Sequence, residues 1–288
     1  MKIINCIVKV KNKIEKYYVR FKVKYSKYEY GLTKNGNSTP IIVSLTTFPK
    51  RINQIDLCLK SILLQKMKPD RIIVWLGSDS NEDELNPILK KYEKYGIEFI
   101  YDKDNDFKSH KKYIYSFKNY KDSIIITLDD DLIYPMDIIS SLVRKYNKYP
   151  NCIIARRVHK ITFDDENNIK KYREWGYECK SIKEPSHFLL ATTGAGTLFP
   201  PNIMPDITTE FDLIKKLALT TDDLWIKFIA LKNNIKIVWV GDTYQMPETV
   251  EYIQESALNH INIFKNKNDE NIRYMMEYFN LSRQDFNK

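Results

Sequence analysis

An α/β fold with a mostly parallel central sheet flanked by helices is predicted by three features of the sequence. Short apolar runs rich in β-branched residues, such as Ile41–Thr46, Arg71–Leu76 and Ile124–Leu128, are typical of strands buried on both faces. Segments with helical apolar spacing separate these runs, and this alternation indicates parallel strands joined by crossover helices. The chain has 288 residues, 43% of them hydrophobic, which is enough for one large domain.

The order of these segments along the chain predicts the individual elements. Strands are expected at residues 41–46, 71–76, 97–101, 124–128, 152–156 and 235–240, and helices at residues 52–65, 82–95, 111–117, 136–149, about 221–231 and 272–279. Gly96 is expected to end the second helix, because glycine readily adopts the left-handed conformation found after helices. The polar residues 162–184 are expected to form a hairpin or a loop excursion.

Residues 1–39 are predicted to be a basic N-terminal segment followed by a linker. Within Lys2–Lys27, Glu15 is the only acidic residue. Val19–Tyr25 alternates as a strand would, whereas the apolar residues between Ile7 and Tyr18 keep helical spacing, so both structures stay open. A basic amphipathic helix on an anionic membrane and a solvated appendage are the two interpretations. Residues 31–40 are rich in Gly, Asn, Ser, Thr and Pro and are expected to be the linker.

Composition narrows the classes of function. The net charge is +9, which suits an anionic partner, but no helix-turn-helix, zinc-finger or RNA-binding motif occurs, so no nucleic-acid partner is expected. No apolar run reaches the roughly 18 residues of a membrane span, and no signal peptide is recognisable. Four scattered cysteines form no CxxC pair. We therefore expect a cytoplasmic protein, with peripheral contact at the inner face of the plasma membrane as an option.

Three consecutive carboxylates, Asp129, Asp130 and Asp131, follow the most apolar predicted strand. Unpaired carboxylates are costly to bury, so they should lie at the rim of the sheet, where α/β proteins bind ligands. Side chains alternate in an extended segment, which would point Asp129 and Asp131 to the same side. Two such carboxylates suit Mg²⁺ or Mn²⁺. The alternative is a solvated acidic loop or a helix cap.

Two further groups of residues in the second half could contribute to a site. Gly194 and Gly196 lie in a short loop where the missing side chains would let the backbone approach a ligand. Asp222 and Asp223 begin a predicted helix, where acids also stabilise the helix N-terminus without any further role. No glycine-rich phosphate loop occurs, so a metal at the acids is the more plausible holder of phosphates.

A D-x-D after an α/β half, a later glycine loop and an acidic pair at a helix start together resemble the GT-A glycosyltransferases. The resemblance is to family 2-like enzymes of bacterial capsule and lipopolysaccharide assembly. It covers roughly Ile41–Tyr252 and is strongest in Ile124–Pro135, Gly194–Pro201 and Thr221–Phe228. It implies a GT-A-like single domain in which residues 40–135 bind the nucleotide sugar and residues 136–288 bind the acceptor and complete the active site.

The resemblance also implies roles for individual residues. Asp129 and Asp131 match the D-x-D and would hold Mn²⁺ or Mg²⁺, while Asp223 matches the general base and Asp222 the acid before it. The implied donor-binding residues are Thr46, Thr47, Arg51, Lys111, Asp129, Asp130, Gly194 and Gly196. For Lys111, simple solvation on a lysine-rich helix is the alternative. Leu76–Asp79 departs from the family's usual D-D-G-S run, so Asp79 receives no role.

Several other side chains stay ambiguous at this point. His260 could complete a metal site, as a late histidine does in several GT-A enzymes, or could be a surface residue. His110 and His187 receive no role. Tyr172, Trp175 and Tyr177 offer flat faces for stacking on a sugar ring, or they could simply pack in the core.

The predicted function is metal-dependent transfer of a sugar from a nucleoside-diphosphate sugar to a hydroxyl of a glycan or lipid-linked glycan. A UDP-sugar is the favoured donor, inversion is the favoured outcome, and Asp223 would be the base. One alternative is a sugar-1-phosphate nucleotidyltransferase, against which the glycine-free segment Thr46–Lys50 argues. The other is a non-catalytic basic protein that binds polyanions or a membrane surface.

Overall fold

The computed structural model describes residues 2–80, 87–103, 105–241, 246–250 and 266–288. The helices are α1 (Lys2–Tyr25), α2 (Asp56–Leu63), α3 (Pro87–Glu93), α4 (Lys111–Asn119), α5 (Ile138–Lys148), α6 (Phe211–Leu217), α7 (Asp222–Lys232) and α8 (Lys267–Tyr278). The strands are β1 (Ile41–Thr46), β2 (Arg71–Leu76), β3 (Ile97–Tyr101), β4 (Ile124–Thr127), β5 (Leu132–Ile133), β6 (Ile153–Ala155), β7 (Val158–Lys160), β8 (Leu189–Ala191), β9 (Thr197–Phe199), β10 (Ile237–Trp239) and β11 (Glu248–Thr249).

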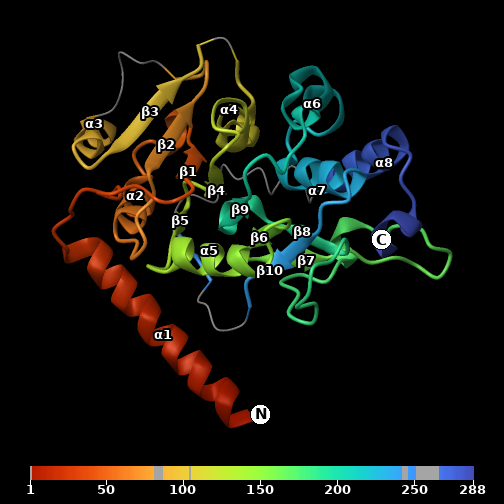
Figure 1. The fold of residues 1–288 in the computed structure, drawn as a ribbon, viewed down its shortest axis with the longest axis horizontal. Helices are drawn as coiled ribbons and strands as arrows, with labels where there is room; N and C mark the ends of the chain where they lie inside the picture. The colour runs from red at the N-terminus through yellow and green to blue at the C-terminus, as the bar shows by residue number, and fades with distance from the viewer. Residues whose placement is uncertain (1, 81–86, 104, 242–245, 251–265) are drawn as a thin grey trace.

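A seven-stranded sheet forms the centre of the molecule, in the order β10-β6-β9-β4-β1-β2-β3 (Figure 1). Strand β9 runs antiparallel to both of its neighbours, β4 and β6, and every other pair in this sheet is parallel. The predicted α/β class with a mostly parallel sheet flanked by helices is therefore confirmed.

Alternate residues of the central strands enter two cores, one on each face of the sheet. On β1, Ile42 belongs to the core beneath α4 and α7, whereas Val43 belongs to the core beneath α2, α3 and α5. Both side chains are at most 1% exposed. The continuous apolar runs of the sequence are explained by this arrangement, because a strand covered on both faces has no polar side.

The structure contains elements that the apolar pattern did not predict. Residues 192–201, predicted only as a glycine loop, form a short turn and then β9, which lies between β4 and β6. A three-residue strand is too short for a periodic signal, and its pairing is set by distant partners. The two-residue strands β5 and β11 pair with each other, as do β7 and β8, and α6 is a further helix.

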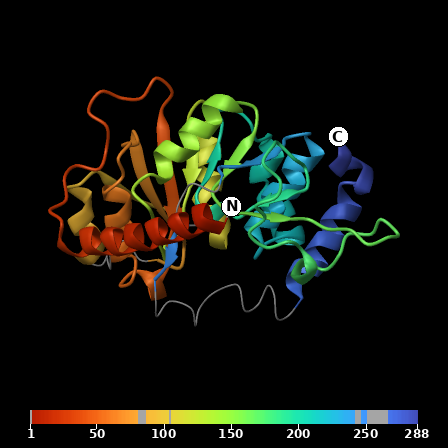
Figure 2. The same cartoon turned by 90° about the horizontal axis from the view of Figure 1, so that it is seen from below.

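The N-terminal segment is a helix, which resolves the choice that the sequence left open. Helix α1 lies on the outside of the molecule, with its N-terminal end directed away from the sheet (Figures 1 and 2). Val19 and Val23 pack against Ile133 and Val250, and these four residues form a small core of their own. Among the described helices, α1 included, none is both long and apolar enough to cross a membrane.

Candidate active site

The three consecutive carboxylates follow β4 at the carboxyl edge of the sheet, between β1 and β9. Asp130 is buried, with 5% of its side chain exposed, and it accepts hydrogen bonds from Thr47 Oγ1 at 2.7 Å and from Arg51 Nη1 at 2.7 Å. Asp129 and Asp131 keep 38% and 24% of their side chains exposed. Asp130 is thus held by the loop after β1, while the other two carboxylates remain accessible.

Arg51 connects this loop to two of the acids, since its Nη1 also lies 3.2 Å from Asp131 Oδ2. One guanidinium does not balance three adjacent carboxylates. Burial and then the charges of Asp129 and Asp130 raise the pKa of Asp131 to about 6. The negative potential at this edge is therefore incompletely compensated by the described side chains, which favours the approach of a cation.

Lys112 joins the acids after β4 to the acids that begin α7. Its Nζ lies 2.7 Å from Asp129 Oδ1 and 2.8 Å from Asp222 Oδ2, and its side chain is 3% exposed. Ser44 on β1 donates to the carbonyl of Lys112 and so fixes the start of α4 on the sheet. Burial opposes the charged form, but the surrounding carboxylates outweigh it and raise the lysine pKa. Two acidic motifs far apart in sequence therefore share one buried cation.

Asp222 and Asp223 lie in the first turn of α7 and have different surroundings. Asp222 accepts from Lys112 and from Ser109 Oγ at 2.8 Å, and Lys112 lowers its pKa despite burial. Asp223 accepts only from Thr193, from the backbone N–H at 2.8 Å and from Oγ1 at 2.6 Å, among the contacts of the described chain. Burial and the neighbouring Asp222 raise the pKa of Asp223 to about 6.

Thr193 explains part of this difference. Its Oγ1 lies 2.9 Å from Asp222 Oδ2 and 2.6 Å from Asp223 Oδ1, but a hydroxyl has only one proton to donate. The hydroxyl can therefore donate to only one of the two carboxylates at a time, while the backbone N–H of Thr193 donates to Asp223. Asp222, which also contacts Lys112, therefore has its negative charge better compensated than Asp223 has.

Gly194 allows Asp129 to occupy its position. A Cβ at residue 194 would lie 1.5 Å from Asp129 Oδ2, so no side chain is tolerated there while Asp129 stays in place. The Tyr134 hydroxyl donates to Gly194 O at 2.6 Å and accepts from the Asp129 N–H at 2.7 Å. Glycine and tyrosine together fix the backbone next to the first carboxylate.

The other proposed donor-binding residues occupy different environments. Thr46 Oγ1 donates to Trp75 O at 2.8 Å, at the end of β1. Lys111 is only 2% exposed, and its Nζ lies 2.9 Å from Asp106 Oδ1 and 3.8 Å from Asp79 Oδ1. Simple solvation of Lys111 is therefore excluded. Gly196 has φ +105°, and a Cβ there would lie 2.8 Å from Ile138, so this glycine serves close packing against α5.

A comparison of the sequence with protein families shows the family of this chain. The model of the family described as glycosyl transferase family 2 matches residues 45–202, more than half of the chain. The chain belongs to glycosyl transferase family 2. The matched segment of this glycosyltransferase contains the three acids after β4 and Arg51, and it also contains Lys111, Lys112, Gly194 and Gly196. It ends before Asp222 and Asp223, so the match does not test the roles that the resemblance implies for these two acids.

Solved structures with a similar fold include mannosyltransferase PcManGT from Pyrobaculum calidifontis in complex with GDP-Man and Mn²⁺. That match has 13% identity and a TM-score of 0.49, and covers 96% of this chain and 81% of that one. S. aureus TarS 1-349 matches with 14% identity and a TM-score of 0.48, covering 73% of this chain and 60% of that one. These similarities concern the overall fold. Among curated proteins, none matches the chain significantly.

The aromatic residues of the predicted sugar site divide between core and surface. Trp175 is 4% exposed and belongs to the core, with its Nε1 donating to Lys170 O at 2.9 Å. Tyr177 is 46% exposed. Tyr172 packs against both, at ring-centroid distances of 5.0 and 5.9 Å, and burial together with Asp223 raises its pKa. Tyr172 is therefore the ring of this group whose pKa Asp223 affects, and Tyr177 is the exposed ring beside it.

None of the histidines in the described part of the enzyme is hydrogen-bonded to the carboxylates of the site, although His110 lies near enough to Asp222 to lower its pKa. His110 is fully buried between Tyr113 and the carbonyl of Ala218, and burial lowers its pKa to about 4. His187 Nε2 lies 2.9 Å from Asn234 Oδ1, and its carbonyl accepts from Lys227 on α7. His260 lies outside the described residues.

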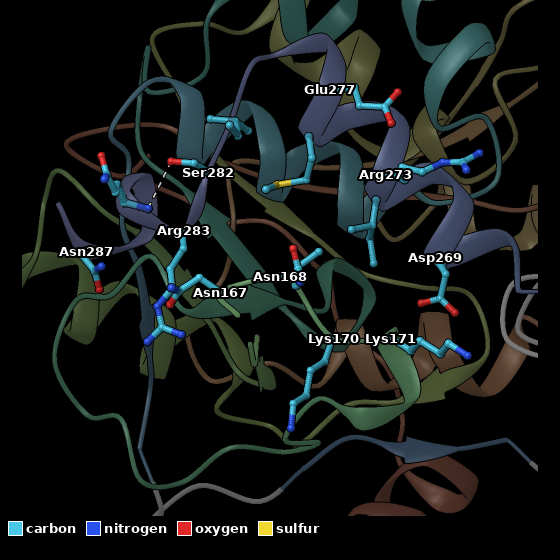
Figure 3. Close-up of a pocket in the computed structure, with 15 residues that line it drawn as sticks. Asn167, Asn168, Lys170, Lys171, Asp269, Arg273, Glu277, Ser282, Arg283 and Asn287 are labelled. Carbon is cyan, nitrogen blue, oxygen red and sulfur yellow. Dashed lines mark hydrogen bonds between the residues drawn. The ribbon is translucent and has the colours of Figure 1, made fainter. Parts of the chain in front are cut away.

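A groove of about 720 Å³ lies between the 167–171 loop, α8 and the C-terminal turn Arg283–Asn287 (Figure 3). Figure 3 shows Lys170 and Lys171 on one side and Arg273 on the other, with Asp269 near Lys171. The backbone N–H of Tyr172 donates to Asp269 Oδ1 at 2.6 Å. Asp269, which lines the groove, thus connects it to Tyr172, in the half of the enzyme expected to receive the acceptor.

Sequence reasoning missed three residues of this site: Lys112, Thr193 and Tyr134. Lys111 was selected in place of Lys112 because it matches the family position. The choice between adjacent residues of a helix depends on how the helix is rotated against the sheet. The sequence does point to Tyr134 and Thr193, because Tyr134 lies in Ile124–Pro135 with the three acids and Thr193 directly precedes Gly194.

Proposed function

We propose that this glycosyltransferase moves a sugar from a nucleoside-diphosphate sugar, with UDP-sugars favoured, to a hydroxyl of a glycan or lipid-linked glycan acceptor. The observation that carries the proposal is the contact of Lys112 with both Asp129 and Asp222. It brings an accessible carboxylate cluster, suited to a metal-bound diphosphate, next to an acidic pair suited to proton abstraction. Donor and acceptor chemistry thereby meet at one edge of the sheet.

Asp129 and Asp131 are the residues we assign to a divalent cation, Mn²⁺ or Mg²⁺. Their donor set fits, because both offer hard carboxylate oxygens and both remain accessible. No group of three His, Cys, Asp or Glu side chains suited to a metal occurs in the described part of the chain. Two protein ligands leave positions for phosphate oxygens, as is usual for Mg²⁺. When bound, such an ion neutralises the charge that develops on the departing diphosphate.

Residues of the loop after β1 and of α4 would hold the rest of the donor. Thr46, Thr47 and Arg51 line the edge beside Asp130, and Lys111 lies with Asp79 beyond the end of β2. The Arg51 guanidinium holds Asp130 and Asp131 in position. Because it lies at this edge, its positive charge would also offset part of the negative charge of the diphosphate. Gly194 lets the Asp129 carboxylate lie against the backbone of the loop, in the position from which it would meet the donor.

Asp223 would act as the general base on the acceptor hydroxyl. It is partly exposed, and a pKa of about 6 makes it a stronger base than an ordinary aspartate while it is still mostly ionised at pH 7. The proton moves from the acceptor hydroxyl to Asp223 as the oxygen attacks the anomeric carbon and the carbon–oxygen bond to the diphosphate breaks. Attack from the face opposite the diphosphate gives inversion. Asp222 stays ionised and holds Lys112.

The two substrates are assigned to successive parts of the chain. Residues 40–135 would bind the donor and residues 136–288 the acceptor. Tyr172 and Tyr177 offer ring faces for an acceptor sugar, and the groove beside α8 could hold further units of a glycan chain. A bacterial capsule or lipopolysaccharide acceptor, a cytoplasmic location and peripheral contact with an anionic membrane complete the proposal, with no nucleic acid as a partner.

Calorimetric titration of UDP, with and without Mn²⁺, into wild type and Asp131→Asn tests the donor site. Wild type should bind UDP only with the metal, and the variant should lose that binding. Asp165→Asn, at an exposed acid on the 162–171 loop, is the control and should bind as wild type does. Equal binding by wild type and Asp131→Asn would refute the metal assignment. GDP replaces UDP if UDP gives no signal, and no binding of either nucleotide would refute the donor proposal.

A further inference from the structure

The outward face of α1 carries a continuous apolar stripe. Val10, Ile14, Tyr17, Phe21 and Tyr25 follow one another at intervals of three or four residues, so they lie on one face of the helix. Their exposed fractions are 53%, 63%, 66%, 59% and 62%. Single exposed apolar residues are normal on protein surfaces, but a contiguous row over four turns marks a binding surface.

The stripe is exposed because α1 docks on the protein through its opposite face. Val19 and Val23 are 6% and 1% exposed, and at about 100° per residue they lie on the side of the helix away from the stripe. Arg20 adds two contacts of 2.9 Å to the carboxylate of Glu248 on β11. The docked face accounts for the attachment of α1 and leaves its aromatic face without a partner among the described residues.

Lysines border the stripe on both sides. By helical position, Lys13 and Lys24 lie along one edge and Lys22 along the other. Lys24 Nζ lies 5.2 Å from the Tyr25 ring and Lys22 Nζ lies 5.6 Å from the Tyr18 ring. Lysine stems therefore run beside the aromatic rings, with the charged ends at the borders. This is the arrangement of helices that lie in the interface of a bilayer.

We infer that the outward face of α1 binds an anionic lipid surface, with the stripe at the level between headgroups and acyl chains and the lysines over anionic headgroups. Nucleic acid would use the lysines but would leave five apolar side chains in water. A second copy of α1 packed on the stripe would bring the two rows of lysines together, and like charges oppose that pairing. A negatively charged membrane complements both features.

The docked face connects this surface to the active site. Helix α1 packs on the ribbon formed by β5 and β11, and β5 starts directly after Asp131. The N–H of Val250 donates to the carbonyl of Asp131 at 2.8 Å. A membrane that holds α1 therefore holds the donor carboxylates close to its surface. This inference deepens the membrane contact of the proposed function, and it rests on that function only for what the membrane presents as acceptor.

Flotation with phosphatidylcholine vesicles, with and without about 30 mol% phosphatidylglycerol, tests the inference on the full chain. Wild type should float only with the anionic vesicles. The stripe variant, Ile14→Gln combined with Phe21→Gln, should bind these vesicles about tenfold more weakly than wild type. In the lysine variant, Lys13→Gln combined with Lys24→Gln, vesicle binding should lose most of its dependence on salt concentration. Lys215→Gln combined with Lys216→Gln, at exposed lysines of α6, is the matched charge control, and Tyr278→Gln is the aromatic control.

Binding of the stripe variant equal to wild type, or no flotation of wild type, would overturn the inference. Sedimentation velocity tests whether a second copy of the chain covers the stripe instead. A wild-type dimer that becomes a monomer in the stripe variant, together with no binding to vesicles, would assign the stripe to that second copy. Circular dichroism confirms that each variant keeps its helices. UDP titration in the absence of vesicles is a separate readout, so vesicle binding without nucleotide binding would refute the donor proposal and leave this inference standing.

Discussion

Asp222 and Asp223 are adjacent in the first turn of α7, yet their carboxyl groups have pKa values displaced in opposite directions. Lys112 lowers the pKa of Asp222 against the effect of burial, whereas burial and the charge of Asp222 raise the pKa of Asp223 to about 6. Pairs of acids whose environments separate their pKa values in this way are typical of acid–base sites. The pair therefore offers direct tests by pH.

Replacing Asp223 by Asn should stabilise the protein at neutral pH. Because the folded-state pKa is raised, the stability contributed by the protonated group is complete below about pH 4 and is lost as pH rises through about 6. Asp223→Asn removes that loss, which is on the order of 3 kcal/mol at pH 7.5. Thermal unfolding should show a higher Tm for the variant than for wild type at pH 7.5, and a much smaller difference at pH 4.5. The rate of sugar transfer should fall by about 10² or more.

Asp222→Asn is the matched comparison, with the opposite sign. Because the pKa of Asp222 is lowered in the folded protein, its ionised form stabilises the protein at pH values above about 4, the pKa of an aspartate in the unfolded chain. That stability is lost as pH falls below this value. The variant should therefore unfold at a lower Tm than wild type at pH 7.5. A stabilised Asp222→Asn variant, or a destabilised Asp223→Asn variant, would contradict the assignment of the two roles.

Removing the Thr193 hydroxyl should shift the pH dependence of catalysis. Wild-type kcat/KM should decline as pH falls below about 6, when Asp223 becomes protonated. The hydrogen bonds from Thr193 lower the Asp223 pKa, so Thr193→Val should move this acidic limb upward by about 0.5–1 pH unit. Thr193→Ser keeps the hydroxyl and should give the wild-type profile. An unchanged limb in Thr193→Val would exclude Asp223 as the titrating base.

Lys112→Met should be the most destabilising single change at the site. It leaves the carboxylates of Asp129 and Asp222 in a confined space without their shared cation, at a cost of about 3 kcal/mol or more. The loss should diminish at acidic pH, because Asp222 without Lys112 keeps the burial that raises its pKa and takes up a proton more readily. Denaturant unfolding at pH 7.5 and pH 5 measures both effects. Lys118→Met, at an exposed lysine of the same helix, should change stability by less than about 0.5 kcal/mol.

Gly194→Ala should abolish donor binding while the protein remains folded. The added methyl would overlap Asp129 Oδ2, so the carboxylate must leave its place beside Lys112. Titration of UDP with Mn²⁺ should give no measurable binding, with a far-ultraviolet circular dichroism spectrum like that of wild type. Gly176→Ala, where the nearest atom would lie at 3.2 Å, is the control and should bind normally. Wild-type affinity in Gly194→Ala would show that Asp129 takes no part in donor binding.

The parallel core of the fold was predictable because its signals are local. Strands β1, β2 and β4 are continuous apolar runs. Gly96 has the predicted left-handed conformation, with φ +88°, but it lies in the turn before β3 and does not cap the helix, because α3 ends at Glu93. Strand β9 was not predictable in the same way. Three residues carry no periodicity, and their place between β4 and β6 results from antiparallel pairing with residues about 70 and 40 positions away along the chain.

The candidate site shows the same division. The acids after β4 stand out in the sequence, because three carboxylates directly after an apolar strand have to lie at the edge of a sheet. Lys112 does not stand out from Lys111. Adjacent residues on a helix differ by about 100° in direction, and only the packing of α4 on β1 decides that Lys112 meets Asp129 while Lys111 meets Asp106.

By itself, the sequence determined the class of fold, the family and the positions of the acids and glycines, since these depend on hydrophobic pattern and on motifs within short stretches. It also determined that residues 2–27 are strongly basic, but not whether they form a helix or a strand. The tertiary structure decided that they form α1, with a docked face and an exposed aromatic face. It also brought Asp129, Lys112, Asp222 and Thr193 together from four segments. The physical reason is that ion pairs, pKa values and exposure depend on neighbours in space, which only the packing of helices on the sheet brings together.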